Sequence, residues 1–117
     1  MDALTVMTEL AEQGRLREEI AQQELSRITA ELINMGATKV ILFGSRSRGE
    51  HSDWSDIDLI AVMQSDLPFP ERLMSVYRVI VPRVALDLLV YTPEEFERGN
   101  PLISAALDHG QVLYEAA

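Results

Sequence analysis

The stretch that decides the fold runs from Phe43 to Leu59 and reads FGSRSRGEHSDWSDIDL. Two short apolar segments flank its polar middle, at residues 39–43 and 57–63, and both have the composition of a buried strand. The residues between them, 44–55, are rich in Gly, Ser, Arg and Asp, which is typical of a loop with room for one helical turn. The sequence therefore predicts two strands joined by a polar loop.

The rest of the chain supplies helices and further extended segments. From residue 15 to 35, apolar residues recur at the spacing of one face of an amphipathic helix, with charged residues such as Glu24 on the side that faces water. The apolar positions of this helix are Leu16, Ile20, Ala21, Leu25, Ile28, Leu32 and Met35. Further elements are expected as a helix at 71–79, a strand at 84–91, a helix start at 92–95, a helix at 101–107 and an extended segment at 111–114. This order predicts an α/β (α+β) fold in which a small mixed β-sheet is backed by helices.

Length and composition predict one domain. The chain has 117 residues, of which 47% are hydrophobic and 25% charged, as in an ordinary globular protein with a core. We expect residues 1–117 to form a single domain. Residues 1–14 are expected to be a weakly helical, flexible N-terminal arm, because Gly14 disfavours helix and separates them from the main helix.

The sequence favours a cytoplasmic protein with no contact to a membrane. Its longest apolar run, residues 59–63, is far shorter than the roughly 20 residues that cross a bilayer. The first residues lack the cationic and apolar segments of a secretory signal. There is no cysteine, which excludes disulfides, thiolate metal ligands and a cysteine nucleophile.

The net charge of −9 argues against direct binding of nucleic acid. Ten basic residues stand against nineteen acidic ones, whereas nucleic-acid binding depends on Lys and Arg that neutralise phosphates. A small phosphorylated ligand is compatible with this charge, because divalent metals held by acidic side chains can supply positive charge locally.

Three aspartates are candidate metal ligands. Asp56 and Asp58 lie two apart at the start of a strand, so both side chains point to the same face, and hard cations such as Mg²⁺ prefer carboxylate oxygens. Asp87 interrupts an apolar strand in which a buried carboxylate needs a cation. If the two strands pair, Asp87 joins the other two in one acidic cluster. A solvated strand start for the pair, and an ion pair of Asp87 with Arg83 or Arg48, remain open alternatives.

Gly44 and Ser45 are candidate phosphate ligands. A glycine directly after a strand lets the backbone approach a ligand closely, and the Ser hydroxyl and neighbouring N–H groups can hold phosphate oxygens. The segment is not a P-loop, because the Lys-Ser/Thr ending is missing. Taken alone, the Gly-Ser pair also fits an ordinary turn.

Together these motifs resemble the signature of the DNA polymerase β-like nucleotidyltransferase superfamily. The signature consists of Gly44-Ser45, ten intervening residues, Asp56-Ile57-Asp58 and a later strand aspartate, Asp87. Within that superfamily the chain is similar to the minimal nucleotidyltransferases, which include the MntA-type antitoxins paired with HEPN-domain toxins. The resemblance covers roughly residues 15 to 115 and implies the palm-like fold of these enzymes.

The resemblance also implies roles for these residues. Asp56, Asp58 and Asp87 would be catalytic and would bind two Mg²⁺ ions, with Asp87 on the side of the attacking hydroxyl. Gly44, Ser45 and Arg46 would bind the phosphates of ATP, and Arg48 is a second candidate for a phosphate contact. An ion pair within the protein is an equally open role for each arginine.

The function implied by the resemblance is that of an antitoxin enzyme. Such a nucleotidyltransferase, of the EC 2.7.7 type, would transfer AMP from ATP to a tyrosine of a separately encoded HEPN ribonuclease toxin and so neutralise it. The chain is short for an enzyme with its own acceptor-binding domain, so a complex with the toxin is expected.

Several alternatives remain at this stage. The chain could be an antitoxin that acts by binding alone, or a nucleotidyltransferase that modifies a small molecule such as an aminoglycoside. Trp54 fits either a base-stacking role or a core anchor of the loop. His51 and His109 lack metal-ligand spacing and are interpreted as surface residues.

Overall fold

The sheet has four strands in the order β3-β2-β1-β4. The structure, a computed structural model, describes residues 2–49 and 56–117. In it β2 runs parallel to β3 and antiparallel to β1, and β4 pairs with β1 in antiparallel orientation. The strands are β1 (Lys39–Phe43), β2 (Ile57–Val62), β3 (Leu86–Tyr91) and β4 (Gln111–Glu115). The predicted mixed sheet is therefore confirmed.

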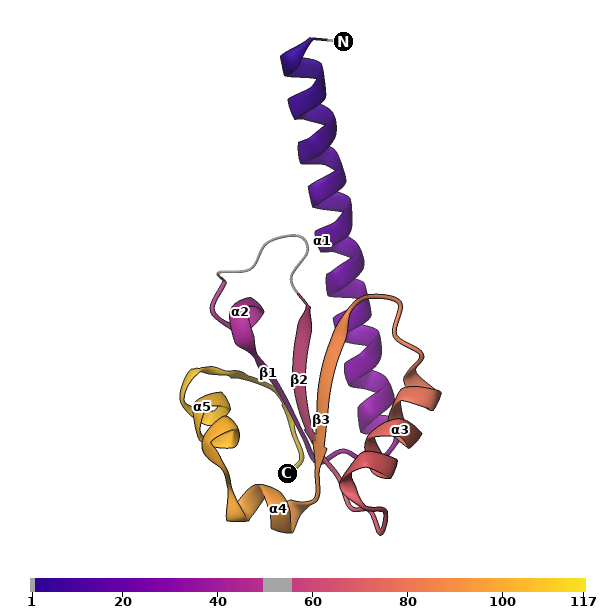
Figure 1. The fold of residues 1–117 in the computed structure, drawn as a ribbon, viewed down its shortest axis with the longest axis vertical. Coiled ribbons are helices and arrows are strands. Elements are labelled where there is room, and N and C mark those ends of the chain that lie inside the picture. The colour runs from indigo at the N-terminus through magenta and orange to yellow at the C-terminus, as the bar shows by residue number, and fades with distance from the viewer. Residues whose placement is uncertain (1, 50–55) are drawn as a thin grey trace.

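Helices lie on both faces of this sheet. Figure 1 shows α1 and α3 against one face, and α4 and α5 on the side of the other. The helices are α1 (Ala3–Asn34), α2 (Gly44–Ser47), α3 (Phe69–Ile80), α4 (Pro93–Arg98) and α5 (Pro101–His109). The single helical turn that the loop was expected to allow is α2, which follows β1 directly. This arrangement agrees with the predicted α/β (α+β) fold.

The alternation of side chains along β2 divides the core in two. Ile57 and Leu59 pack into the larger cluster, as predicted, whereas Ile60 points to the opposite face. The helical residues of the larger cluster include Ile28 and Leu32 of α1 and Val76 and Ile80 of α3. On the opposite face, Ile103 and Ala106 of α5 complete the smaller cluster. Both faces of β2 are thus covered along most of its length.

The first helix is longer than the sequence predicts. It runs without a break from Ala3 through Gly14 to Asn34, and the Asp2 side chain caps it by accepting from the Thr5 N–H. The predicted break at Gly14 is wrong, because one glycine costs a helix only about 1 kcal/mol and the cap offsets that cost. The N-terminal half of α1 extends past the sheet, along the 58 Å long axis of the molecule (Figure 1). Neither α1 nor any other helix in the described residues is both long enough and apolar enough to cross a membrane.

The buried face of α1 also differs from the prediction at three positions. Ala21, Ile28 and Leu32 are buried as expected, but Leu16 and Ile20 are exposed. Glu24, which was placed on the water-facing side, is only 4% exposed. A carboxylate in this position is tolerated because its charge and its hydrogen-bonding capacity are both satisfied there.

Two groups donate hydrogen bonds to the carboxylate of Glu24. The Arg27 guanidinium donates to both carboxylate oxygens, at 2.6 and 2.9 Å, and the backbone N–H of Arg83 donates at 2.9 Å. The bond from Arg27 is the main reason that the pKa of Glu24 falls from 4.5 to about 2; burial opposes this change, and the Arg83 N–H adds to it. Because the folded state lowers this pKa, the resulting stabilisation is present above about pH 4.5 and is lost as the pH falls toward 2.

Glu24→Gln is therefore expected to destabilise the fold in a pH-dependent way. At pH 7 the free energy of unfolding should fall by about 1–3 kcal/mol, because two buried donors lose a charged acceptor. The deficit relative to wild type should shrink between pH 4.5 and pH 2.5, where Glu24 itself takes up a proton. Urea unfolding at a series of pH values measures both effects. Glu31→Gln is the control, since the Glu31 carboxylate lies 3.8 Å from Arg27 and is more exposed. An equal loss for both variants would contradict the role given to Glu24.

Candidate active site

The turn from β1 into α2 presses directly against an aspartate of the neighbouring strand. Gly44 has a φ of +73°, and a Cβ built on it would overlap Oδ2 of Asp58 and come within 3.0 Å of its Cγ. The register explains this contact, because Phe43, the last residue of β1, is paired with Asp58. Only glycine accommodates both the backbone conformation and the close approach. The predicted phosphate cradle and one predicted metal ligand are therefore direct neighbours.

A second aspartate lies beside Asp58 on the next strand. Because β2 and β3 are parallel and pair in register, Asp87 is directly opposite Asp58, and both side chains point to the same face. Asp56 lies two residues before Asp58, just ahead of β2. The pairing on which the predicted acidic cluster depended is thus present. As placed, however, the described residues contain no group of three or more acidic or histidine side chains close enough to hold a metal.

Asp87 is not buried, which corrects the interpretation of its strand. The sequence suggested a strand covered on both faces, but Asp87 is exposed. The smaller core cluster on that face includes Leu89 and Tyr91 of β3 but does not reach Asp87, so only the far half of the strand, with Val90 and Tyr91, is covered on both faces. The case for Asp87 as a functional residue therefore comes from its position opposite Asp58 and not from a cost of burial.

The carboxyl of Asp58 holds its proton more strongly than a free aspartate does. Partial burial is the main cause of its raised pKa; the charges of Asp87 and then Asp56 act in the same direction, and Arg46 opposes them. Negative charge is thus concentrated at one end of the sheet. Such a site favours a cation, because a cation relieves the repulsion among the carboxylates.

Arg46 of α2 and Arg48, the residue that follows α2, have different surroundings. The side chain of Arg46 is buried, and its Nη1 lies 3.2 Å from a carboxylate oxygen of Glu18 on α1. Arg48 is exposed at the end of the turn. Arg46 therefore ties α2 to α1, whereas the guanidinium that solvent reaches most readily near Gly44 is that of Arg48.

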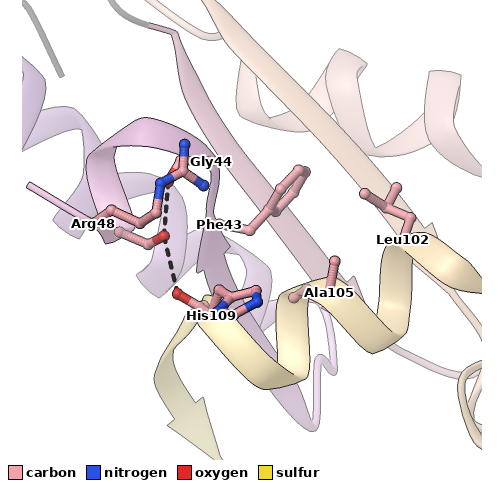
Figure 2. Close-up of a pocket in the computed structure, with 9 residues that line it drawn as sticks. Phe43, Gly44, Arg48, Leu102, Ala105 and His109 are labelled. Atoms are coloured by element: carbon pink, nitrogen blue, oxygen red, sulfur yellow. Dashed lines mark hydrogen bonds between the residues drawn. The ribbon is translucent and has the colours of Figure 1, made fainter. Parts of the chain in front are cut away.

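A pocket of about 210 Å³ opens between α2 and α5, next to the Gly44 turn (Figure 2). Phe43, Leu102 and Ala105 give it an apolar wall, and Arg48 and His109 lie at its polar side. Ser47 links α2 to α5. Its Oγ donates to the carbonyl oxygen of Gly44 within α2, at 2.8 Å, and lies 3.4 Å from the carbonyl oxygen of His109 on α5. His109, expected to be a surface residue, is exposed and helps to line this pocket.

Tyr77 is a residue of this site that the sequence analysis missed. Its hydroxyl, on α3, donates to the carbonyl oxygen of Leu86 at 2.9 Å and accepts from the N–H of Leu88 at 3.1 Å. These are the two residues on either side of Asp87, so Tyr77 fixes the edge strand at that point. No sequence pattern identifies such a contact, since it joins a helix to a strand edge. Trp54, His51 and Ser55 lie outside the described residues.

A side chain at Gly44 should lower the free energy of unfolding by more than its positive φ alone would explain. Gly49 is a matched control, because its φ is +71° and no described atom lies within 4 Å of a Cβ built there. Gly49→Ala should lower the free energy of unfolding by about 1–2 kcal/mol, and Gly44→Ala by about 1 kcal/mol more through its overlap with Asp58.

The extra cost should disappear when Gly44→Ala is combined with Asp58→Ala, because only the carboxyl group overlaps the new Cβ. Denaturant unfolding of the single and double variants measures this coupling. Equal costs at Gly44 and Gly49 would show that the contact with Asp58 does not constrain the fold.

Solved structures with the same fold are found among nucleotidyltransferases. A protein from Sulfolobus solfataricus assigned as a nucleotidyltransferase superposes with a TM-score of 0.64 at 22% identity, over 87% of this chain and 86% of that one. A toxin–antitoxin structure with AMP-PNP superposes with a TM-score of 0.54 at 18% identity, over 78% of this chain and 73% of that one. At these identities the likeness concerns the fold alone.

Sequence comparison extends this likeness to a family. No curated protein matches the chain. Residues 22–113, however, match the family described as nucleotidyltransferase domain. This region contains β1, β2 and β3, the start of β4, the Gly44 turn and the three aspartates. The chain belongs to the nucleotidyltransferase domain family.

Proposed function

We propose that this chain is a Mg²⁺-dependent nucleotidyltransferase that transfers AMP from ATP to a tyrosine of a HEPN ribonuclease toxin and so acts as its antitoxin. Membership of the family supports transferase activity in general. The observation that carries the proposal is the contact of Gly44 with Asp58, beside Asp87. It brings a glycine turn suited to phosphate and carboxylates suited to a cation within contact distance of each other.

The three aspartates fit magnesium in donor type, and the strand register brings two of them, Asp58 and Asp87, side by side. Their oxygens are the hard ligands that Mg²⁺ prefers, and the side chains of Asp58 and Asp87 point to the same face of the sheet. Partial burial, and then the charges of Asp87 and Asp56, raise the pKa of Asp58, so a cation bound there would relieve the repulsion. We assign two Mg²⁺ ions to Asp56, Asp58 and Asp87. Bound there, Mg²⁺ would neutralise the triphosphate and favour ionisation of the attacking hydroxyl.

The residues around Gly44 would hold the triphosphate. Because Gly44 lacks a side chain, phosphate oxygens can approach the backbone, and the Ser45 hydroxyl lies at the next position. Of the two arginines, Arg48 suits a direct phosphate contact, since it is exposed at the pocket beside Gly44. Arg46, buried against Glu18, would position the turn instead, which revises the contact expected from the resemblance.

Asp87 would take the proton of the acceptor. The tyrosine oxygen forms a bond to the α-phosphorus, the bond from that phosphorus to the bridging oxygen breaks, and pyrophosphate leaves. The phenolic proton passes to the carboxylate of Asp87, which is exposed and therefore accessible to a side chain of another protein. A free tyrosine has a pKa of about 10, so such a proton acceptor matters at neutral pH.

The partner is proposed from two observations. One structure of the same fold is a toxin–antitoxin with AMP-PNP. In addition, a net charge of −9 complements a ribonuclease, whose substrate requires a basic surface. These observations favour a protein acceptor over a small molecule.

Asp58→Asn and Asp87→Asn should abolish transfer and preserve folding. Each should lower the rate of AMP transfer by about 10²–10⁴-fold, and Asp58→Asn should leave the melting temperature unchanged or raise it, because repulsion is relieved. The measurement is the intact mass of the toxin after incubation with Mg²⁺ and ATP. Asp66→Asn, an exposed position after β2, is the control. If the Asp87→Asn variant neutralised the toxin as durably as wild type does, the proposed transferase reaction would be wrong, and the chain would be an antitoxin that acts through binding alone.

Tyr77→Phe should impair catalysis without weakening nucleotide binding. Removal of the hydroxyl frees the two backbone groups beside Asp87, so the proton acceptor loses its fixed position, while the Gly44 turn lies on other elements. The expected result is a kcat about 10-fold lower with an unchanged KM for ATP. Tyr114→Phe, on β4, is the matched control. A raised KM for ATP with unchanged kcat would contradict this role.

A further inference from the structure

The N-terminal part of α1 exposes apolar side chains far from the core. Residues 2–13, here called the projecting segment, are all exposed. They include Leu4, Met7 and Leu10, which are 74%, 66% and 60% exposed. Together with Ala11, these residues follow the three- and four-residue spacing that places side chains on one side of a helix. Single exposed apolar residues are common, but a row of them on one helix marks a contact surface.

Nothing within the described chain stabilises this segment apart from its own helix. An isolated helix of about 12 residues is marginal in water, and most helical stability in proteins comes from packing of an apolar face. Further along the same helix, Ile28 and Leu32 have such packing against the sheet and α3. The projecting segment therefore has an amphipathic helical face of the kind that binds in a groove between helices of another protein.

The charge of the projecting segment indicates which kind of partner binds to it. The projecting segment contains Asp2, Glu9 and Glu12 and no basic residue, and the whole chain carries −9. A second copy would bring like charges together along the contact, and an anionic lipid surface would repel the segment. A basic protein would be attracted to it.

The position of the segment relative to the catalytic residues adds a functional argument. Figure 1 shows that the projecting segment extends past the end of the sheet at which α2 lies and β2 begins, which is the end that carries Asp56 and Asp58. At the base of the segment, Glu18 of α1 pairs with Arg46 of α2. A protein bound to the segment would thus be held beside the end of the sheet where the acceptor hydroxyl must arrive.

We infer that the projecting segment is the docking helix for the toxin: its apolar face, centred on Met7, binds a groove between helices on a basic protein and presents that protein to the carboxylates. This inference rests on the proposed function for the identity of the partner. It adds the surface that recognises the partner, which is separate from the site that modifies it.

The test compares two variants that introduce the same charge on opposite sides of α1. Met7→Asp places a carboxylate in the apolar face, and Thr5→Asp places one about 200° around the helix. Both positions are exposed, so neither change should disturb the core. The probe is a HEPN ribonuclease toxin of the kind proposed above, in a catalytically inactive form. Its Kd is measured by calorimetry, and the steady-state kinetics of AMP transfer are measured on the same protein.

Met7→Asp should raise the Kd and the KM for the toxin at least about 10-fold, with unchanged kcat and unchanged KM for ATP, whereas Thr5→Asp should match wild type. Equal affinities for the two variants would overturn the docking inference and leave the proposed reaction standing. If wild type bound the toxin tightly but transferred no AMP, and Met7→Asp lost this binding, the docking inference would stand and the proposed reaction would be wrong.

Three other results would overturn the choice of occupant. Sedimentation of the chain alone as a dimer that Met7→Asp dissociates would assign the segment to a second copy. Failure of wild type to bind the HEPN protein would overturn both the docking inference and the choice of partner. Binding to anionic vesicles that Met7→Asp abolishes would assign the segment to a membrane surface.

Discussion

The contact between Gly44 and the carboxyl group of Asp58 is the constraint on which the rest of the site depends. It follows from the register that pairs Phe43 with Asp58, because the chain leaves β1 at that pair and turns at once into α2. A side chain at Gly44 would overlap the carboxyl group and would have to adopt a φ of +73°. The same strand register therefore places the turn that suits phosphate next to the carboxylate that suits a metal.

The charges around this contact form a connected set. Asp58 is flanked by Asp56 and Asp87, and these like charges raise its pKa in addition to burial, while Arg46 lowers it. Arg46 is itself buried and needs a partner, because an unpaired buried charge is costly. Glu18 of α1 is that partner. Among the described residues, Arg46 therefore offsets part of the negative charge around Asp58.

The sequence predicted local features well and tertiary ones only in part. Strand 39–43 was predicted with its bounds because a buried apolar run ends there at Gly44, and the opposition of Asp58 and Asp87 followed once the two strands paired. The burial of Asp87 was predicted wrongly because nothing in the sequence shows that the core cluster on that face of β3 does not reach Asp87. Glu24 was misplaced because the backbone N–H of Arg83, which donates to it, is 59 residues away in the sequence. The hydroxyl of Tyr77 lies only 9 residues from Leu86, but no sequence pattern shows that this helix packs against the edge of that strand.

The full length of α1 was not predicted from the sequence either, and this helix contacts the segments that lead into both parts of the candidate site. Glu18 reaches α2 through Arg46, and Glu24 accepts from the backbone N–H of Arg83, three residues before β3 begins. One straight helix thereby holds both the turn beside Asp58 and the approach to the strand of Asp87. Because these two anchors lie six residues apart on a single rigid element, the spacing of the two halves of the site is set by helical geometry. The positions of the α2 turn and of the approach to β3 therefore depend on a helix that contributes none of the candidate site residues.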